Sequence, residues 1–264
     1  VFSDFIDDLP VFGVFLAFAS ASLILYEIGF RLGRWWQDRT PDEKEGPTGM
    51  LVGSILALMA FLLAITMSMS VDRFDARRGL VLEEANAIGT TYLRAGYLPE
   101  PASSQSRDLL REYVPLRIAT EDLNDRDVLA ASLERASAIL EGLWPIAEDL
   151  AREAPDDVML ALYIESLNDT IDVNAARTNA GVNVRVPETV LWLLFIGAVL
   201  TLGMVGFNAG LSRHRSPLTA IVLIIVLGAV ITLIVDIDRP QGGTLTVSQQ
   251  VMIELEKQIG PPAR

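Results

Sequence analysis

The sequence predicts an all-α protein with four transmembrane helices, two before and two after a central helical domain that lies outside the membrane. Three observations lead to this fold class. Apolar runs occupy residues 10–32, 49–71, 189–211 and 217–235, and each is near the ~20 residues that cross a bilayer as a helix. Between the second and third runs, apolar residues recur at helical spacing among many charges. Strand signals are essentially absent.

The composition agrees with a membrane protein. The chain has 264 residues, of which 51% are hydrophobic and 21% are charged. A chain can contain this many hydrophobic and charged residues together only when the hydrophobic residues are segregated into long runs. With no cysteine in the chain, a disulfide framework and thiolate metal sites are excluded.

Residues 10–32 form the first predicted span. We interpret it as a retained span rather than a cleaved signal peptide, because apolar residues continue to Phe30 and no basic stretch precedes them. Trp35 and Trp36 mark the membrane interface at its end. Together with the second span it makes up a transmembrane region over residues 1–71.

The second span is predicted to continue out of the membrane as one long helix, because no proline interrupts the chain between Gly49 and Leu98. Small residues spaced four apart let membrane helices approach closely. They predict that the second and third spans pack on each other, with the second span nearest the axis of an oligomer. The helix-packing candidates are Gly49, Gly53, Ala57, Gly206 and Gly210.

A polar stripe begins at the outer end of the second span and is predicted to line a hydrated axis shared between subunits. The stripe is predicted to continue along the charged part of the same helix outside the membrane. Among the pairs of adjacent acidic residues, Glu83–Glu84 is the better candidate for a functional role, because it lies on this helix. The pore-lining candidates are Thr66, Ser70, Arg73, Arg77, Glu83, Asn86, Thr90 and Arg94. The alternative is ordinary bonding of hydroxyls to the backbone inside the span, with arginines at the interface.

The central domain is assigned to residues 72–187. It holds 21 acidic residues against 12 arginines and no lysine, a net charge of −9, which disfavours a nucleic-acid partner and attracts cations. Helices are expected over 103–123, with a bend at Pro115, from Asp127, and from Asp156. The helix that begins at Asp127 carries a heptad seam, which packs either inside the subunit or against another subunit. The seam residues are Leu129, Leu133, Ala136, Leu140, Leu143, Ala147 and Leu150.

The third and fourth spans are assigned to residues 188–238, and a tail with a short helix to residues 239–264. Charges of both signs gather where the spans meet the central domain, and in this partly dehydrated zone they are expected to pair. In particular, Asp236 and Asp238 are expected to compensate arginines of the long helix. The charge-network candidates are Asp72, Asp75, Arg78, Arg185, Asp236, Asp238 and Arg239.

The orientation follows from the short loops. Arg31, Arg34, Arg39 and Lys44 lie between the first two spans, and Arg213 and Arg215 lie between the last two. Positive charge in short loops favours the cytoplasm. We therefore expect a multi-pass protein of the bacterial inner membrane, with the central domain and both termini outside the cytoplasm.

No enzyme motif is present: the chain has no glycine-rich phosphate loop, no H-x-x-x-H and no G-x-S-x-G. The sequence predicts no enzyme, no cofactor and no metal site. The expected partners are membrane lipid, further copies of the chain and ions.

Two stretches resemble a known family. RFDARRGLVLEEANAIGTTYLRAGYLP at residues 73–99 and DIDRPQGGTLTVSQQ at residues 236–250 are similar to the bacterial membrane family of bestrophin-like domain proteins. Bestrophins are pentamers whose pore is lined by the second span and whose helical domain is cytosolic. The resemblance implies a homo-oligomer with the second span central.

These observations favour an oligomeric membrane protein that forms an ion channel or a channel-like pore of the bestrophin-like type. The alternative is a non-conducting membrane scaffold or accessory subunit that binds a partner protein through its acidic domain.

Overall fold

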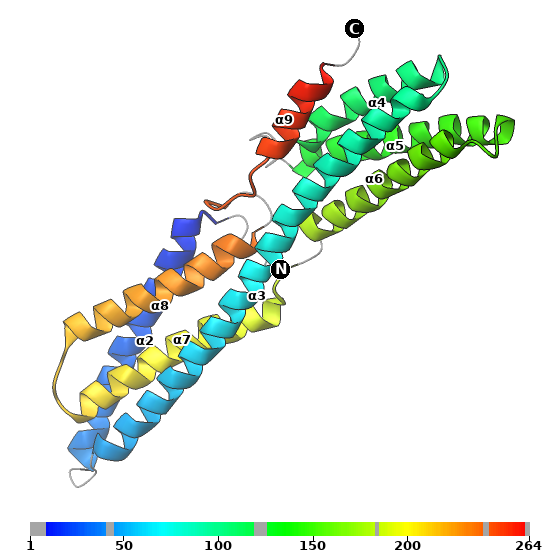
Figure 1. The fold of residues 1–264 in the computed structure, drawn as a ribbon. Helices are drawn as coiled ribbons and strands as arrows, with labels where there is room; N and C mark the ends of the chain where they lie inside the picture. Colours follow the sequence, from blue (N-terminus) through cyan, green and yellow to red (C-terminus); the bar gives the residue numbers. More distant parts are fainter. Residues whose placement is uncertain (1–8, 41–44, 119–125, 183–184, 240–242, 262–264) are drawn as a thin grey trace. The chain divides into compact units, whose positions relative to one another are not determined.

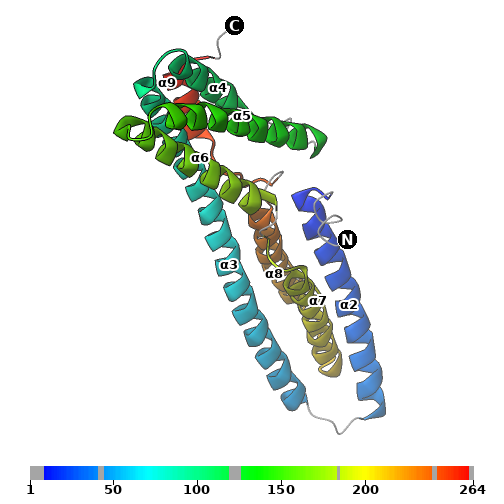
Figure 2. The same ribbon diagram turned by 90° about the vertical axis from the view of Figure 1, so that its right-hand side faces the viewer.

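The computed structural model describes residues 9–40, 45–118, 126–182, 185–239 and 243–261. These residues are almost entirely helical, and no strand occurs among them. Asp4, Asp7, Asp8 and Lys44, which bear on the predicted orientation, lie outside this part of the chain. Four helices are long and apolar enough to cross a membrane, and they coincide with the four predicted spans. The chain divides into two compact units (Figures 1 and 2).

The membrane unit comprises Val1–Arg73 and Arg185–Leu245. Its helices are α2 (Val11–Arg39), the first part of α3 (Glu45–Arg94), α7 (Glu188–Leu211) and α8 (Pro217–Asp238). Proline lies at the start of α8, where its missing N–H costs no intrahelical bond. Phe18, Met59, Leu202 and Ile231 meet in the core between the helices.

Glycines bring α2 and α7 into backbone contact. A Cβ added to Gly206 would lie 2.1 Å from the carbonyl oxygen of Tyr26, and one added to Gly210 would lie 2.3 Å from that of Phe30. On α2, a Cβ at Gly29 would lie 2.0 Å from the carbonyl oxygen of Gly203. Gly206 and Gly210 thus lie in a helix contact, but their partner is the first span and not the second. The second span meets α7 through other residues, with the side chain of Met59 against Gly197. The first span carries the complementary glycines.

The helix α3 runs without a break through 50 residues, about 75 Å at 1.5 Å per residue. The prediction that the second span continues as one long helix is confirmed (Figure 1).

The acidic unit comprises Phe74–Val184 and Thr246–Arg264. It contains the second part of α3, the short 3-10 helix η1 (Ala95–Tyr97), α4 (Ala102–Arg117), α5 (Arg126–Glu153), α6 (Val158–Val182) and α9 (Gln250–Ile259). Val81 and Ile88 of α3, Leu143 of α5, Leu167 of α6 and Met252 of α9 share one core. The C-terminal residues are therefore part of this unit.

The two prolines behave differently. The helix α4 ends two residues after Pro115, whereas α5 continues through Pro145 as one helix. The heptad seam of α5 packs inside the subunit: Ala136, Leu140 and Leu143 are buried in the core of the acidic unit.

Candidate functional site

The polar stripe of α3 is buried rather than open to water. Thr66 is 3% exposed, Ser70 is 0% exposed and Arg77 is 7% exposed. The hydroxyl of Thr66 donates to the carbonyl oxygen of Leu62, 2.9 Å away. This is the hydroxyl-to-backbone bonding that was the alternative to a pore lining.

The stripe continues at different residues from those predicted. Thr66 and Glu83 are 17 residues apart, so an ideal helix sets them about 100° apart around its axis. Thr66 and Glu84 are 18 residues apart, which is about five full turns. Glu84 and Thr91 are both 0% exposed, whereas Glu83 and Thr90 are exposed. We call Thr66, Ser70, Arg77, Glu84 and Thr91, which are buried, together with the half-buried Arg73, the polar ridge of α3.

Glu84 is the centre of a buried charge network in the acidic unit. Its Oε1 accepts hydrogen bonds from Nε of Arg117 and from the hydroxyl of Tyr113, both at 2.7 Å. Its Oε2 accepts one from Nη1 of Arg177 at 2.5 Å. Arg177 also donates to the side-chain oxygen of Gln249, 2.8 Å away. One carboxylate therefore ties α3, α4 and α6 together, and Arg177 adds the segment that leads into α9.

The surroundings of this network perturb Tyr113. Burial, followed by the nearby charge of Glu84, raises the pKa of Tyr113 above its ordinary value. Burial likewise raises the pKa of Tyr163, whose hydroxyl donates to Ser106. Both phenols stay neutral in the folded protein at physiological pH.

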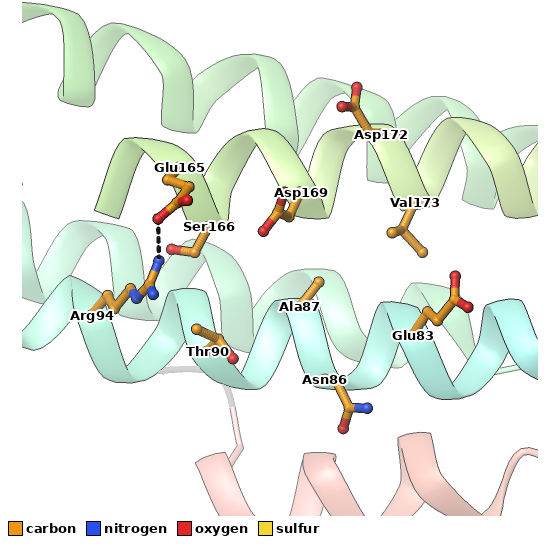
Figure 3. Close-up of a pocket in the computed structure, with 10 residues that line it drawn as sticks. All are labelled: Glu83, Asn86, Ala87, Thr90, Arg94, Glu165, Ser166, Asp169, Asp172 and Val173. Carbon is orange, nitrogen blue, oxygen red and sulfur yellow. Dashed lines mark hydrogen bonds and ion pairs between the residues drawn. The ribbon is translucent and has the colours of Figure 1, made fainter. Parts of the chain in front are cut away.

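Beside the ridge, α3 and α6 form a cleft of about 460 Å³ in the acidic unit. Figure 3 shows the two helices side by side, with Arg94 reaching from α3 to Glu165 on α6. The lining contains four carboxylates and one guanidinium. The lining residues are Glu83, Asn86, Ala87, Thr90, Arg94, Glu165, Ser166, Asp169, Asp172 and Val173.

Two polar side chains of the cleft, Arg94 and Ser166, are held by hydrogen bonds to α6. Arg94 donates to the carbonyl oxygen of Leu162 at 2.6 Å and lies 3.4 Å from Glu165. Ser166 donates back to the carbonyl oxygen of Tyr163. Within the described residues, no group of three or more histidines, cysteines or carboxylates is placed to hold a metal ion. Four carboxylates against one guanidinium give the cleft a net negative charge.

The predicted charge network is only partly assembled. Nη1 of Arg73 lies 3.8 Å from Oδ1 of Asp238, which also accepts the backbone N–H of Val186 at 2.9 Å. Asp236 instead accepts hydrogen bonds from the backbone N–H of Thr244, at 2.8 Å, and from its hydroxyl. Asp236 caps the segment after α8, so the expectation that it compensates an arginine is wrong.

The remaining candidates of that network are spread over several elements. Arg239 donates to the carbonyl oxygen of Leu9, 2.8 Å away. Asp72, Asp75 and Arg78 are exposed on α3, and Arg185 is half-buried ahead of α7. Arg117 and Arg177 were not among the sequence candidates, and Glu84 was named only as a pair with Glu83, without a distinction between the two. The spacing of Glu84 from buried Val81 and Ile88, three and four residues away, was the available signal.

The exposed side of α3 in the membrane unit carries small residues. A Cβ added to Gly53 would meet no atom within 4 Å, whereas one added to Gly49 would lie 3.7 Å from the side chain of Asn208. The small residues on this exposed face are Gly53, Ala57, Ala60, Ala64 and Ser68. We call them the small-residue face of α3.

Comparison with protein families places the fold among known membrane proteins. A model of the family described as Bestrophin-like domain matches residues 11–252. No curated protein matches the chain.

Solved structures of a bacterial bestrophin homologue from Klebsiella pneumoniae share the fold. Two point mutants of that protein superpose with TM-scores of 0.68 and 0.67, at 16% and 17% sequence identity. Each match covers 94% of this chain, and 96% and 97% of the other. The structure solved by Zn-SAD phasing gives a TM-score of 0.64 at 17% identity, over 93% of this chain and 96% of that one.

Proposed function

The chain belongs to the bestrophin-like family of membrane proteins, and we propose that copies of it assemble into an ion-conducting pore with α3 nearest the axis. The family is one of channels, and the four apolar helices support the membrane location. We propose no enzymatic role.

The observation that carries the proposal is the small-residue face of α3. No side chain of the protomer covers Gly53, and Ala57, Ala64 and Ser68 are also exposed. A helix that met only lipid would gain nothing from such a row, because close approach of backbones is the benefit that small residues bring in membranes. The row of small residues therefore favours close contact with α3 of neighbouring subunits, or a pore between the subunits that these small residues line.

Residues that line the acidic cleft share a side of α3 with the small-residue face. Ser68 and Asn86 are 18 residues apart, which is about five turns of an uninterrupted helix. Asn86 and Thr90, both exposed, line the cleft. Among the predicted pore-lining residues, we therefore retain Glu83, Asn86, Thr90 and Arg94, and we replace the buried Thr66, Ser70 and Arg77 by the small-residue face.

The charge of the cleft favours cations as the conducted ions. Glu83, Asp169 and Asp172 have no hydrogen-bonded or ion-paired partner among the described residues, whereas the single lining arginine is paired with Glu165. A field of one sign in a cleft raises the local concentration of counter-ions. Rings of carboxylates select cations in this way in other channels.

The orientation remains the one that the short loops predict. We propose that the acidic unit lies outside the cytoplasm, supported by the five arginines between the spans, Arg31, Arg34, Arg39, Arg213 and Arg215.

Ion flux through purified protein in liposomes tests the proposal. A potassium gradient should drive flux in vesicles that contain the protein, and the permeability ratio of potassium to chloride should exceed one. The double substitution Glu83→Gln with Asp169→Asn should lower that ratio. The matched control is Glu148→Gln, an exposed carboxylate of α5 that lies outside the cleft.

A stable oligomer without flux would support the alternative, a non-conducting scaffold. The acidic cleft would then serve a protein partner, and neutralising Glu83 and Asp169 would weaken that partner's binding instead.

A further inference from the structure

Five arginines gather where α2 ends and where α7 is joined to α8, all within the membrane unit. Arg31, Arg34 and Arg39 belong to the last turns of α2. Arg213 and Arg215 lie in the connection between α7 and α8. The two helix ends are held together by the glycine contact, since a Cβ added to Gly210 would lie 2.8 Å from the backbone nitrogen of Arg34. We call this set the arginine patch.

Two carboxylates neutralise only part of the patch. Nη2 of Arg215 lies 2.9 Å from both oxygens of Glu27, and Nε of Arg31 lies 2.8 Å from one of them. Arg213 donates to Asp38 at 2.5 Å. These pairs account for three of the five arginines.

Arg34 and Arg39 have no carboxylate partner in the described part of the chain. Arg34 is exposed, and its side chain makes no hydrogen bond or ion pair with the described residues. Arg39 instead lies over the ring of Trp35, with its guanidinium carbon 3.8 Å from the ring centroid. A cation over an indole keeps its outward N–H groups available for an anion.

The neighbours of these two arginines place them at headgroup depth. Trp35 is 46% exposed and Trp36 is 42% exposed, and tryptophans concentrate at the membrane interface. One turn earlier, Leu32 is 51% exposed on the same helix, which suits the edge of the hydrocarbon region. This order of side chains favours a position of Arg34 and Arg39 at the level of the lipid phosphates.

We propose that Arg34 and Arg39 bind the phosphate of an anionic phospholipid, with Trp35 packed beside the headgroup. Guanidinium groups bind phosphate through charge-assisted, bidentate hydrogen bonds. A zwitterionic lipid brings its own cation to a surface that already has a surplus of positive charge. A lipid with net negative charge therefore fits better, and the remaining arginines are less available because Glu27 and Asp38 occupy them.

Lipid titration of the purified protein in detergent tests this assignment without reference to conduction. Dioleoyl phosphatidylglycerol should stabilise the wild-type protein against heat and bind in native mass spectra more tightly than dioleoyl phosphatidylcholine, whose acyl chains are the same. The double substitution Arg34→Gln with Arg39→Gln should weaken the apparent affinity for phosphatidylglycerol about 30-fold, since each interfacial arginine contributes a factor of about five.

Three further variants and ligands make the result decisive. Arg34→Lys with Arg39→Lys should keep only part of the affinity, because the charge remains but the bidentate hydrogen bonds and the stacking on Trp35 are lost. Arg152→Gln, an exposed arginine of the acidic unit, should bind lipid as the wild type does. Equal binding of the two lipids, an unchanged affinity in the double glutamine variant, or equal stabilisation by inorganic phosphate would each overturn the proposal.

Discussion

Nε of Arg117 lies 2.7 Å from Oε1 of Glu84, and both side chains are buried, with 4% and 0% of their surfaces exposed. Arg177 approaches the other oxygen of the same carboxylate. One negative charge thus faces two positive ones inside the acidic unit. Such an arrangement holds only while the carboxylate is present, because burying an ion without its partner is costly.

Glu84→Gln should therefore destabilise the protein strongly. The substitution keeps the shape of the side chain but leaves two arginines without their counter-charge, which should cost about 3–5 kcal/mol. The neighbouring Glu83 is exposed, so Glu83→Gln is the matched control and should change stability by less than about 0.5 kcal/mol. Thermal unfolding of the detergent-solubilised variants measures both. Similar melting temperatures for the two variants would contradict the role of Glu84.

High pH should destabilise the acidic unit through Tyr113. The pKa of Tyr113 is raised in the folded state, whereas an unfolded tyrosine titrates near ~10. Below that pH the contribution of the neutral phenol to stability is fully present. Above it the unfolded chain loses the proton while the folded protein keeps it, so stability falls as pH rises.

Tyr113→Phe separates this effect from general alkaline unfolding. The variant lacks the titrating group, so its stability should fall less steeply than that of the wild type above pH ~10. Urea unfolding at several pH values gives the two slopes. Parallel slopes would show that Tyr113 titrates normally in the folded protein.

Two glycine substitutions distinguish the internal helix contact from the exposed face. Gly206→Ala adds a Cβ at 2.1 Å from a backbone oxygen and should destabilise the protein by about 1–3 kcal/mol or more, since packed helices resist added volume. Gly53→Ala adds one in open space and should leave the stability of the protomer unchanged.

A larger residue at Gly53 should act on assembly instead. Gly53→Leu should lower the oligomeric mass, measured by light scattering in detergent, while the protein stays folded. An oligomer of wild-type size would argue against packing of subunits through the small-residue face.

The orientation is testable because the chain has no cysteine of its own. Ser104 lies on α4 of the acidic unit and Ser216 lies in the connection between α7 and α8, and both are exposed. Ser104→Cys should react with a membrane-impermeant thiol reagent on intact cells whose outer membrane, if present, is permeabilised. Ser216→Cys should stay unlabelled. The reverse labelling would place the acidic unit in the cytoplasm.

The fold follows from local patterns of the sequence. Apolar runs of bilayer length identify the spans, and the lack of a proline between Gly49 and Leu98 identifies the long helix α3. The heptad spacing of α5 shows which of its residues are buried, although it leaves open what covers them. The contact that covers them is internal.

The site is harder to predict because it depends on the phase of one helix and on distant partners. A shift of one residue, from Glu83 to Glu84, separates an exposed carboxylate from a buried one. The partners of Glu84 are 33 and 93 residues away along the chain, beyond the reach of helical spacing. Likewise, Gly206 could be identified as a packing residue, but nothing in the spacing of α7 shows that its partner is α2.

Block of the pore by a thiol reagent tests the central claim most directly, namely that the small-residue face of α3 lines the conducting pathway. Ser68 lies on this face, and Ser70, two residues on, is 0% exposed inside the protomer. In liposomes, a charged methanethiosulfonate reagent should reduce potassium flux through the Ser68→Cys variant and leave flux through Ser70→Cys and the cysteine-free wild type unchanged. Flux through Ser68→Cys that is unaffected, or block of Ser70→Cys alone, would contradict the account and return the pathway to the polar ridge.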